Sequence, residues 1–260
     1  MTSLAKAGAA GLFLAACAFA GIGHAKDVLS PAYLAHALAD PRRPADEVAR
    51  DPARKPAEVL AFAGVKPGDK VADVYIGGGY YSRILSAVVG PSGHVYGIIP
   101  AEMARNCAPA EFAGGHVLEH DARYRNVSVM IQPAAGFRPP EPLDAIVSAQ
   151  NYHDLYDGFM EHADVAQIDR ALYRSLKPGG VLLVVDHAAE AGSGVRDTET
   201  RHRIDPARVR KDLEAAGFVF VGESDVLRNP ADDHSLRVFD PKIRGRTDQV
   251  ILKFRRPAAA

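Results

Sequence analysis

The sequence has few cysteines, no excess of one sign of charge, and no long apolar run beyond its first residues. Of its 260 residues only two are cysteine, and 31 basic residues face 32 acidic ones, for a formal net charge of −1. No stretch gathers lysine and arginine on one periodic face, which argues against a nucleic-acid partner. The hydrophobic content of 47% is typical of one globular domain with a substantial core.

The first 25 residues have the pattern of a secretory signal. Lys6 is their only charged residue, the run 7–22 is apolar, and Gly23 and Ala25 are the small residues that signal peptidases prefer. The run is too short and too rich in alanine and glycine for a membrane span. We therefore expect cleavage after Ala25, with a periplasmic mature chain that begins at Lys26.

One alternative at the N-terminus stays open. Residues 14–17 (LAAC) resemble a bacterial lipobox, which would make Cys17 a lipidated N-terminus. The apolar sequence continues beyond Cys17, and this favours simple cleavage. Cys107 is then the only cysteine left, so an intramolecular disulfide is excluded.

Residues 26–260 are predicted to form a single α/β domain, without internal repeats. An N-terminal helical segment, 26–62, precedes a series of apolar strands that alternate with helical segments, a pattern typical of a parallel sheet covered on both faces. The expected strands are 71–74, 94–99, 126–131, 143–149 and 181–185, and helices are expected near 101–113, 159–176 and 205–217. Two last strands, 218–221 and 249–254, are joined by a polar insert, 224–248, without a crossover helix, so they should pair antiparallel.

The stretch 71–83 (VADVYIGGGYYSR) organises the rest of the chain. A strand runs into three consecutive glycines, Gly77, Gly78 and Gly79, and an amphipathic helix follows at once. Such a unit presents bare backbone N–H groups at a helix N-terminus, at the carboxyl end of the first strand of a doubly wound sheet. A tight turn without a ligand has the same pattern, so the glycines alone do not decide between the two.

The pattern as a whole resembles the class I S-adenosylmethionine-dependent methyltransferases, and is nearest to an exported bacterial branch of them. Residues 73–79 are similar to the acidic loop with spaced glycines that holds the methionine part of the cofactor. Residues 176–182 (LKPGGVL) resemble the family's turn into its fifth strand, and the end of the chain resembles its reversed hairpin. The resemblance covers residues 56–255 and implies a Rossmann-like, seven-stranded, mostly parallel sheet that binds S-adenosylmethionine.

The resemblance also assigns cofactor-binding residues. It implies Asp73 and the three glycines for the loop. Tyr80 is expected to wall the pocket, Asn151 lies at the end of the fourth strand, and Glu102 lies near the end of the second. The family's first loop glycine is replaced by Tyr75. Ile99-Pro100 and Gln132-Pro133 stand where the family places acids for the ribose and the adenine, so Glu102 is the nearest substitute.

The acceptor side is predicted at the end of the fourth strand. His153 is the candidate general base and Asp154 its orienting partner, with helix capping by Asn151 and Asp154 as the alternative. His153, Asp154, Asp186, His187 and His202 carry the chemistry of metal ligands, but they lack a fixed ligand spacing, so no metal site is predicted.

The function indicated by these features is S-adenosylmethionine-dependent methyl transfer to a small-molecule acceptor. Two alternatives stay open: a non-catalytic protein on the same fold that binds a small metabolite, and a metal-assisted enzyme built around His153, Asp186 and His187. Arginines at 201, 203, 244 and 246 would suit an anionic substrate or a solvated surface equally well.

Overall fold

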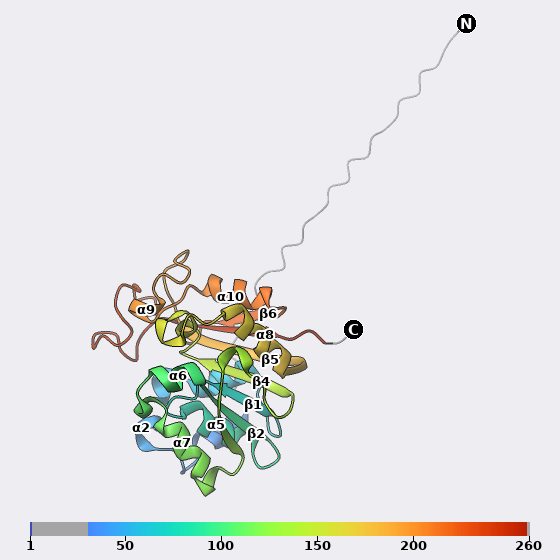
Figure 1. Cartoon of the computed structure of the whole chain (residues 1–260), viewed down its shortest axis with the longest axis vertical. Coiled ribbons are helices and arrows are strands. Elements are labelled where there is room, and N and C mark those ends of the chain that lie inside the picture. The colour runs from blue at the N-terminus through green and yellow to red at the C-terminus, as the bar shows by residue number, and fades with distance from the viewer. Residues whose placement is uncertain (2–30, 259–260) are drawn as a thin grey trace.

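A single seven-stranded sheet organises the computed structural model, which describes Met1 and residues 31–258 (Figure 1). The strand order is β3-β2-β1-β4-β5-β7-β6, and every neighbouring pair is parallel except β5–β7 and β6–β7. The strands are β1 Lys70–Val74, β2 His94–Pro100, β3 Val127–Gln132, β4 Leu143–Ala149, β5 Leu176–His187, β6 Val219–Ser224 and β7 Gln249–Arg255. The predicted fold class, including the reversed hairpin at the end of the chain, is confirmed.

Helices cover both faces of the sheet. Alternate residues of β1 to β5 and of β7 point into two separate apolar clusters, one packed against α1, α4, α5 and α7, the other against α8 and α10. The helices are α1 Ala32–Leu38, α2 Ala45–Val48, α3 Asp51–Arg54, α4 Pro56–Ala63, α5 Tyr80–Val89, α6 Ala101–Asn106, α7 Ala113–His120, α8 Val165–Ser175, α9 Thr198–Arg201 and α10 Pro206–Ala215. None of the helices in the described ranges is long and apolar enough to cross a membrane. The predicted signal, residues 1–25, lies outside the described residues except for Met1.

Two expected helices have different limits in the structure. The segment near 101–113 divides into α6, a short 3₁₀ turn (Pro109–Glu111) and α7, which continues to residue 120. The expected helix 159–176 begins only at Val165, because the side chain of Asp164 caps the N–H of Gln167. Residues 153–160 instead form two 3₁₀ turns, His153–Tyr156 and Gly158–Met160.

The polar insert between β6 and β7 contains neither helix nor strand, yet one buried ion pair anchors it. Arg203 and Asp232 are both buried, and Nη2 of Arg203 lies 2.8 Å from Oδ2 of Asp232. Arg203 also donates to the carbonyl oxygens of Ala188 and Leu236. Arg203 therefore ties the insert to the loop after β5, and it is not available to bind a substrate.

Candidate active site

The glycine loop between β1 and α5 has the backbone that its sequence requires. Tyr75, Gly77 and Gly79 have positive φ values of 64°, 51° and 86°. Such angles favour glycine, and Tyr75 adopts one at the position where the methyltransferases that the sequence resembles have a glycine. A Cβ added at Gly78 would meet nothing within 4 Å. The loop therefore offers an open backbone edge at the start of α5.

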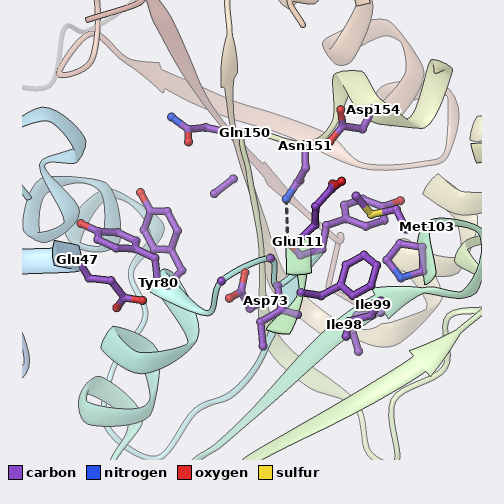
Figure 2. A pocket seen from close by; sticks show the side chains of 18 of the residues that line it. Glu47, Asp73, Tyr80, Ile98, Ile99, Met103, Glu111, Gln150, Asn151 and Asp154 are labelled. Atoms are coloured by element: carbon purple, nitrogen blue, oxygen red, sulfur yellow. Dashed lines mark hydrogen bonds between the residues drawn. The ribbon is translucent and has the colours of Figure 1, made fainter. Parts of the chain in front are cut away.

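A pocket of about 260 Å³ lies beside this loop, at the carboxyl ends of β1, β2 and β4 (Figure 2). The switch between β1 and β4 is where an open α/β sheet binds ligands. Figure 2 shows Asp73 and Tyr80 toward one side and the apolar side chains of Met103, Ile98 and Ile99 toward the other. Of the predicted cofactor residues, those that line the pocket are Asp73, Gly77, Gly78, Tyr80 and Asn151.

Asp73 is a buried carboxyl group in this pocket, only 4% exposed. The hydroxyl of Ser82 donates a hydrogen bond of 2.7 Å to its Oδ2. Burial raises the pKa of Asp73 to about 7, although the hydrogen bonds from Ser82 and the charge of Arg54 act in the opposite direction. A nearby cationic ligand would favour the ionised form of this carboxyl.

Two predicted cofactor residues lie elsewhere. Gly79 does not line the pocket, and a Cβ on it would come within 2.6 Å of Cδ1 of Leu118. Its glycine therefore serves the left-handed turn and close packing. The carboxylate of Glu102 turns away from the pocket and accepts a hydrogen bond from the N–H of Ala134. Neither residue lines the pocket, so their cofactor roles stay predictions.

Two other acids, which the sequence analysis did not single out, line the pocket instead. Glu47 comes from α2 and forms an ion pair with Arg83 of α5. Glu111, from the 3₁₀ turn before α7, has an exposed side chain and no ion pair within the part of the chain that the structure describes. A carboxylate in an irregular segment has no local sequence signal, so only the fold brings Glu111 to the pocket.

The loop after β4 places His153 and Asp154 together, but in an unexpected way. Asp154 lines the pocket, whereas His153 does not, and it is only 3% exposed. His153 Nδ1 lies 2.7 Å from Oδ1 of Asp186, and its Nε2 lies 3.1 Å from Oδ1 of Asp154. Burial lowers the pKa of His153, but the two carboxylates outweigh burial and raise it well above the ordinary value.

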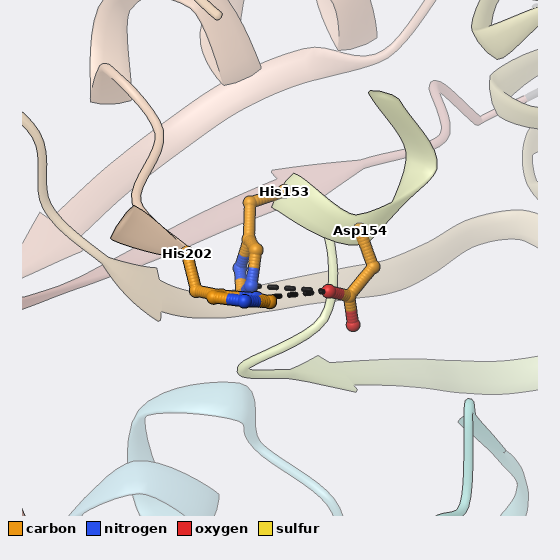
Figure 3. A group of neighbouring side chains, drawn as sticks. All are labelled: His153, Asp154 and His202. Atoms are coloured by element: carbon orange, nitrogen blue, oxygen red, sulfur yellow. Dashed lines mark ion pairs between the residues drawn. The ribbon is translucent and has the colours of Figure 1, made fainter. Parts of the chain in front are cut away.

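His202, which comes from the loop after α9, lies against the same pair (Figure 3). Its Nδ1 is 3.8 Å from Oδ1 of Asp154, and its ring stacks edge-on to the ring of His153 at 5.4 Å between centroids. His187 is not part of this group, and its Nδ1 lies 2.8 Å from Oγ1 of Thr247. Burial lowers the pKa of His187 to about 3, so its imidazole is neutral at physiological pH.

A second cavity of about 590 Å³ adjoins the first, and the two share Arg50, Arg54 and Gln150 in their linings. It lies between α3 and the polar insert, which contributes Arg244. None of these three arginines forms an ion pair within residues 31–258. Among residues 31–258 no acidic residue lines this second cavity, so its lining carries positive charge.

No protein-family model matches the chain. Its sequence is 31% identical over 133 residues to a protein-L-isoaspartate O-methyltransferase of Ignicoccus hospitalis, covering 49% of this chain and 52% of that protein. A protein of the same name from Methanothrix thermoacetophila is 34% identical over 125 residues, covering 46% of this chain and 48% of that protein. The chain thus spans about half the length of these curated relatives.

Solved structures share the fold over a larger part of the chain. A SAM-dependent methyltransferase from Aquifex aeolicus aligns with a TM-score of 0.55 at 22% identity, covering 77% of this chain and 89% of that one. The cyclase SpnF aligns with a TM-score of 0.57 at 20% identity, covering 80% of this chain and 82% of that one. The architecture is therefore the Rossmann-like methyltransferase fold. About half of the sequence is also similar to part of the protein-L-isoaspartate O-methyltransferases.

Proposed function

We propose that this protein binds S-adenosylmethionine in the pocket beside the glycine loop and transfers its methyl group to a small acceptor. One observation carries the proposal: an open glycine edge, Gly77–Gly78, stands beside the buried carboxyl of Asp73 at the switch point of the sheet. When bound, S-adenosylmethionine supplies an electrophilic methyl group on a cationic sulfur. The fold is shared with a cyclase, so the site and not the architecture supports this reaction.

The lining of the pocket suits the different parts of such a cofactor. Gly77 and Gly78 leave backbone accessible to the methionine part, and Asp73 offers a carboxylate to its positive charge. Ile98, Ile99 and Met103 form an apolar wall of the kind that accepts a purine ring. Glu111 lines the same pocket and is the carboxylate available to hydroxyl groups.

The acceptor would enter through the second cavity. Methyl transfer gains most from holding the two reactants in line at about 3–3.5 Å. The shared residues Arg50 and Arg54 connect the two cavities, and with Arg244 they favour an acceptor with an anionic group. His153 does not fit the role of a free base, because both of its ring nitrogens face carboxylates: Nδ1 faces Asp186 and Nε2 faces Asp154.

The acceptor class can be tested by following methyl-labelled S-adenosylmethionine with a panel of small carboxylates and phosphates. Arg244→Gln should raise the KM for an anionic acceptor about tenfold, the loss of one charge-assisted contact of roughly 1.5 kcal/mol. Arg246→Gln is the matched control, since Arg246 lies outside both linings and donates to the carbonyl of Lys242. Equal KM values in both variants would contradict the anionic acceptor.

A second acceptor is favoured by the relatives, whose names specify protein L-isoaspartate. An isoaspartyl group also presents a carboxylate, so an isoaspartyl peptide belongs in the same panel. If only the peptide becomes labelled, the acceptor is an isoaspartyl peptide and not a small molecule. Absence of labelled product with every acceptor, despite cofactor binding, would favour a binding protein without turnover.

We also propose that the protein works outside the cytosol. The support is the signal-like sequence of residues 1–25. Protein recovered from the cell envelope should begin at Lys26. An N-terminus at lipidated Cys17 would mean membrane anchoring, and an intact Met1 in the cytosol would contradict export.

A further inference from the structure

The group formed by His153, Asp154 and His202 has the composition and spacing of a metal site (Figure 3). We propose that the protein binds one divalent transition-metal ion, of the zinc type, through Nε2 of His153, a carboxylate oxygen of Asp154 and Nδ1 of His202. These three ligand atoms all lie within 4.8 Å of one another. Imidazole nitrogen and carboxylate oxygen are the ligands that such ions prefer among side chains without sulfur.

The distances fit an ion at their centre. Bonds of about 2.0–2.2 Å place neighbouring ligands of a tetrahedral or octahedral ion roughly 3.0–3.5 Å apart. The observed separations from Oδ1 of Asp154 are 3.1 Å to His153 and 3.8 Å to His202. These two separations lie within a few tenths of an ångström of that range, and all three ligand atoms lie within 4.8 Å of one another.

Asp186 gives His153 the orientation of a metal ligand. Its Oδ1 lies 2.7 Å from Nδ1 of His153, and its Oδ2 accepts from the backbone N–H of the same residue. Asp186 also accepts from the N–H of His187 and is fully buried. A histidine that donates its Nδ1–H to a carboxylate presents the lone pair of Nε2, which is the arrangement that supports a metal-bound imidazole.

An independent observation at Asp157 points to a missing partner. Asp157 is 1% exposed, and its Oδ2 lies 4.0 Å from Nδ1 of His202. Its Oδ1 has no hydrogen-bond partner among the described residues. A buried carboxylate oxygen without a partner is costly, and a cation next to it would offset that cost. Asp157 lies outside the group of three ligands, so it is placed to reach the ion through a water molecule.

Metal binding would also rearrange one contact. Nη2 of Arg237 lies 2.9 Å from Nε2 of His202, which must accept this hydrogen bond. When Nδ1 holds the ion, the neutral imidazole carries its proton on Nε2, so the exposed Arg237 would move away. Because Asp154 also lines the cofactor pocket, the bound ion would lie at its edge, where it can bind an acceptor oxygen and favour its ionised form. This last role rests on the proposed methyl transfer; metal binding itself does not.

The test is a Zn²⁺ titration of the full chain after treatment with a chelator, against a chromophoric competitor. One equivalent should bind, and His202→Asn should weaken binding by about 100-fold or more, since even supporting residues around a metal contribute about 10–100-fold. Asparagine tolerates the left-handed backbone of residue 202 (φ 53°), which protects the fold. His120→Gln, at an exposed position, is the matched control and should bind like the wild type.

Asp154→Asn provides a second variant with the same expected loss. Failure to bind one equivalent of Zn²⁺, or tight binding that survives both substitutions, would overturn the proposal. The titration needs neither S-adenosylmethionine nor an acceptor, so its outcome is independent of whether the protein transfers methyl groups. Visible absorption of the Co²⁺-loaded protein, lost in His202→Asn, would identify the ligand set directly.

Discussion

Replacing Asp73 by asparagine should make the protein without cofactor more stable at alkaline pH than the wild type. The carboxyl of Asp73 is 4% exposed, and burial raises its pKa to about 7 from 3.8. The native state therefore keeps a proton that the unfolded chain releases. The free energy of unfolding falls as pH rises from about 4 and levels off above about 7, because the unfolded state binds fewer protons over this interval.

The size of the effect follows from the two pKa values. At about 1.4 kcal/mol per pKa unit, the difference between the folded and unfolded pKa values lowers the free energy of unfolding by roughly 4 kcal/mol in total. Roughly 2.5 kcal/mol of this loss falls between pH 5 and pH 8. Asp73→Asn has no proton to release. Its stability relative to the wild type should therefore improve by roughly that amount from pH 5 to pH 8.

Urea unfolding at pH 5, 6, 7 and 8 would measure this difference, and cofactor titration at the same pH values would complement it. A cationic ligand favours the ionised carboxyl, so wild-type affinity for S-adenosylmethionine should rise through pH 7, while Asp73→Asn should bind weakly without this rise. A stability difference that does not change with pH would refute the buried, neutral state of Asp73.

Two further substitutions test the surroundings of the site. Gly114→Ala should weaken cofactor binding at least tenfold in a calorimetric titration, because the added Cβ would lie 2.2 Å from the carbonyl oxygen of Gly78. This loss is expected although alanine favours helices. Gly136→Ala, whose Cβ would make only ordinary contacts, is the control. Arg203→Met should lower the free energy of unfolding, measured in urea, by about 3–5 kcal/mol, because it leaves Asp232 buried without its ion-pair partner. The double variant with Asp232→Leu should recover part of this loss. A single variant as stable as the wild type would contradict the anchoring role.

The sequence predicts most of the sheet because its strands are continuous apolar runs. The segment 143–149 is predicted with the limits that β4 has, and the antiparallel hairpin follows from the missing crossover helix. The limits of helices are less predictable, because a polar side chain can cap a helix inside an apolar pattern. Asp164 caps α8, which therefore begins later than the pattern predicts. The glycines 114–115 lie inside α7, where they let the helix pass close to the glycine loop.

The sequence predicts the candidate site only where its residues are close together along the chain. Asp73, Gly77 and Gly78 belong to one strand–loop–helix unit, and all three line the pocket. His202 lies 49 positions after His153 in the sequence yet contacts its ring, and Glu111 lies on a short 3₁₀ turn. The periodicity of apolar residues does not predict such contacts, because they depend on how the loops at the carboxyl edge of the sheet fold over one another.

Calorimetric titration with S-adenosylmethionine and S-adenosylhomocysteine tests the central claim most directly. The full chain should bind one equivalent of each, and Gly78→Val should lose this binding while it stays folded by circular dichroism, because its side chain would fill the open edge of the pocket. No binding by the wild type, or undiminished binding by Gly78→Val, would contradict a cofactor site at the glycine loop.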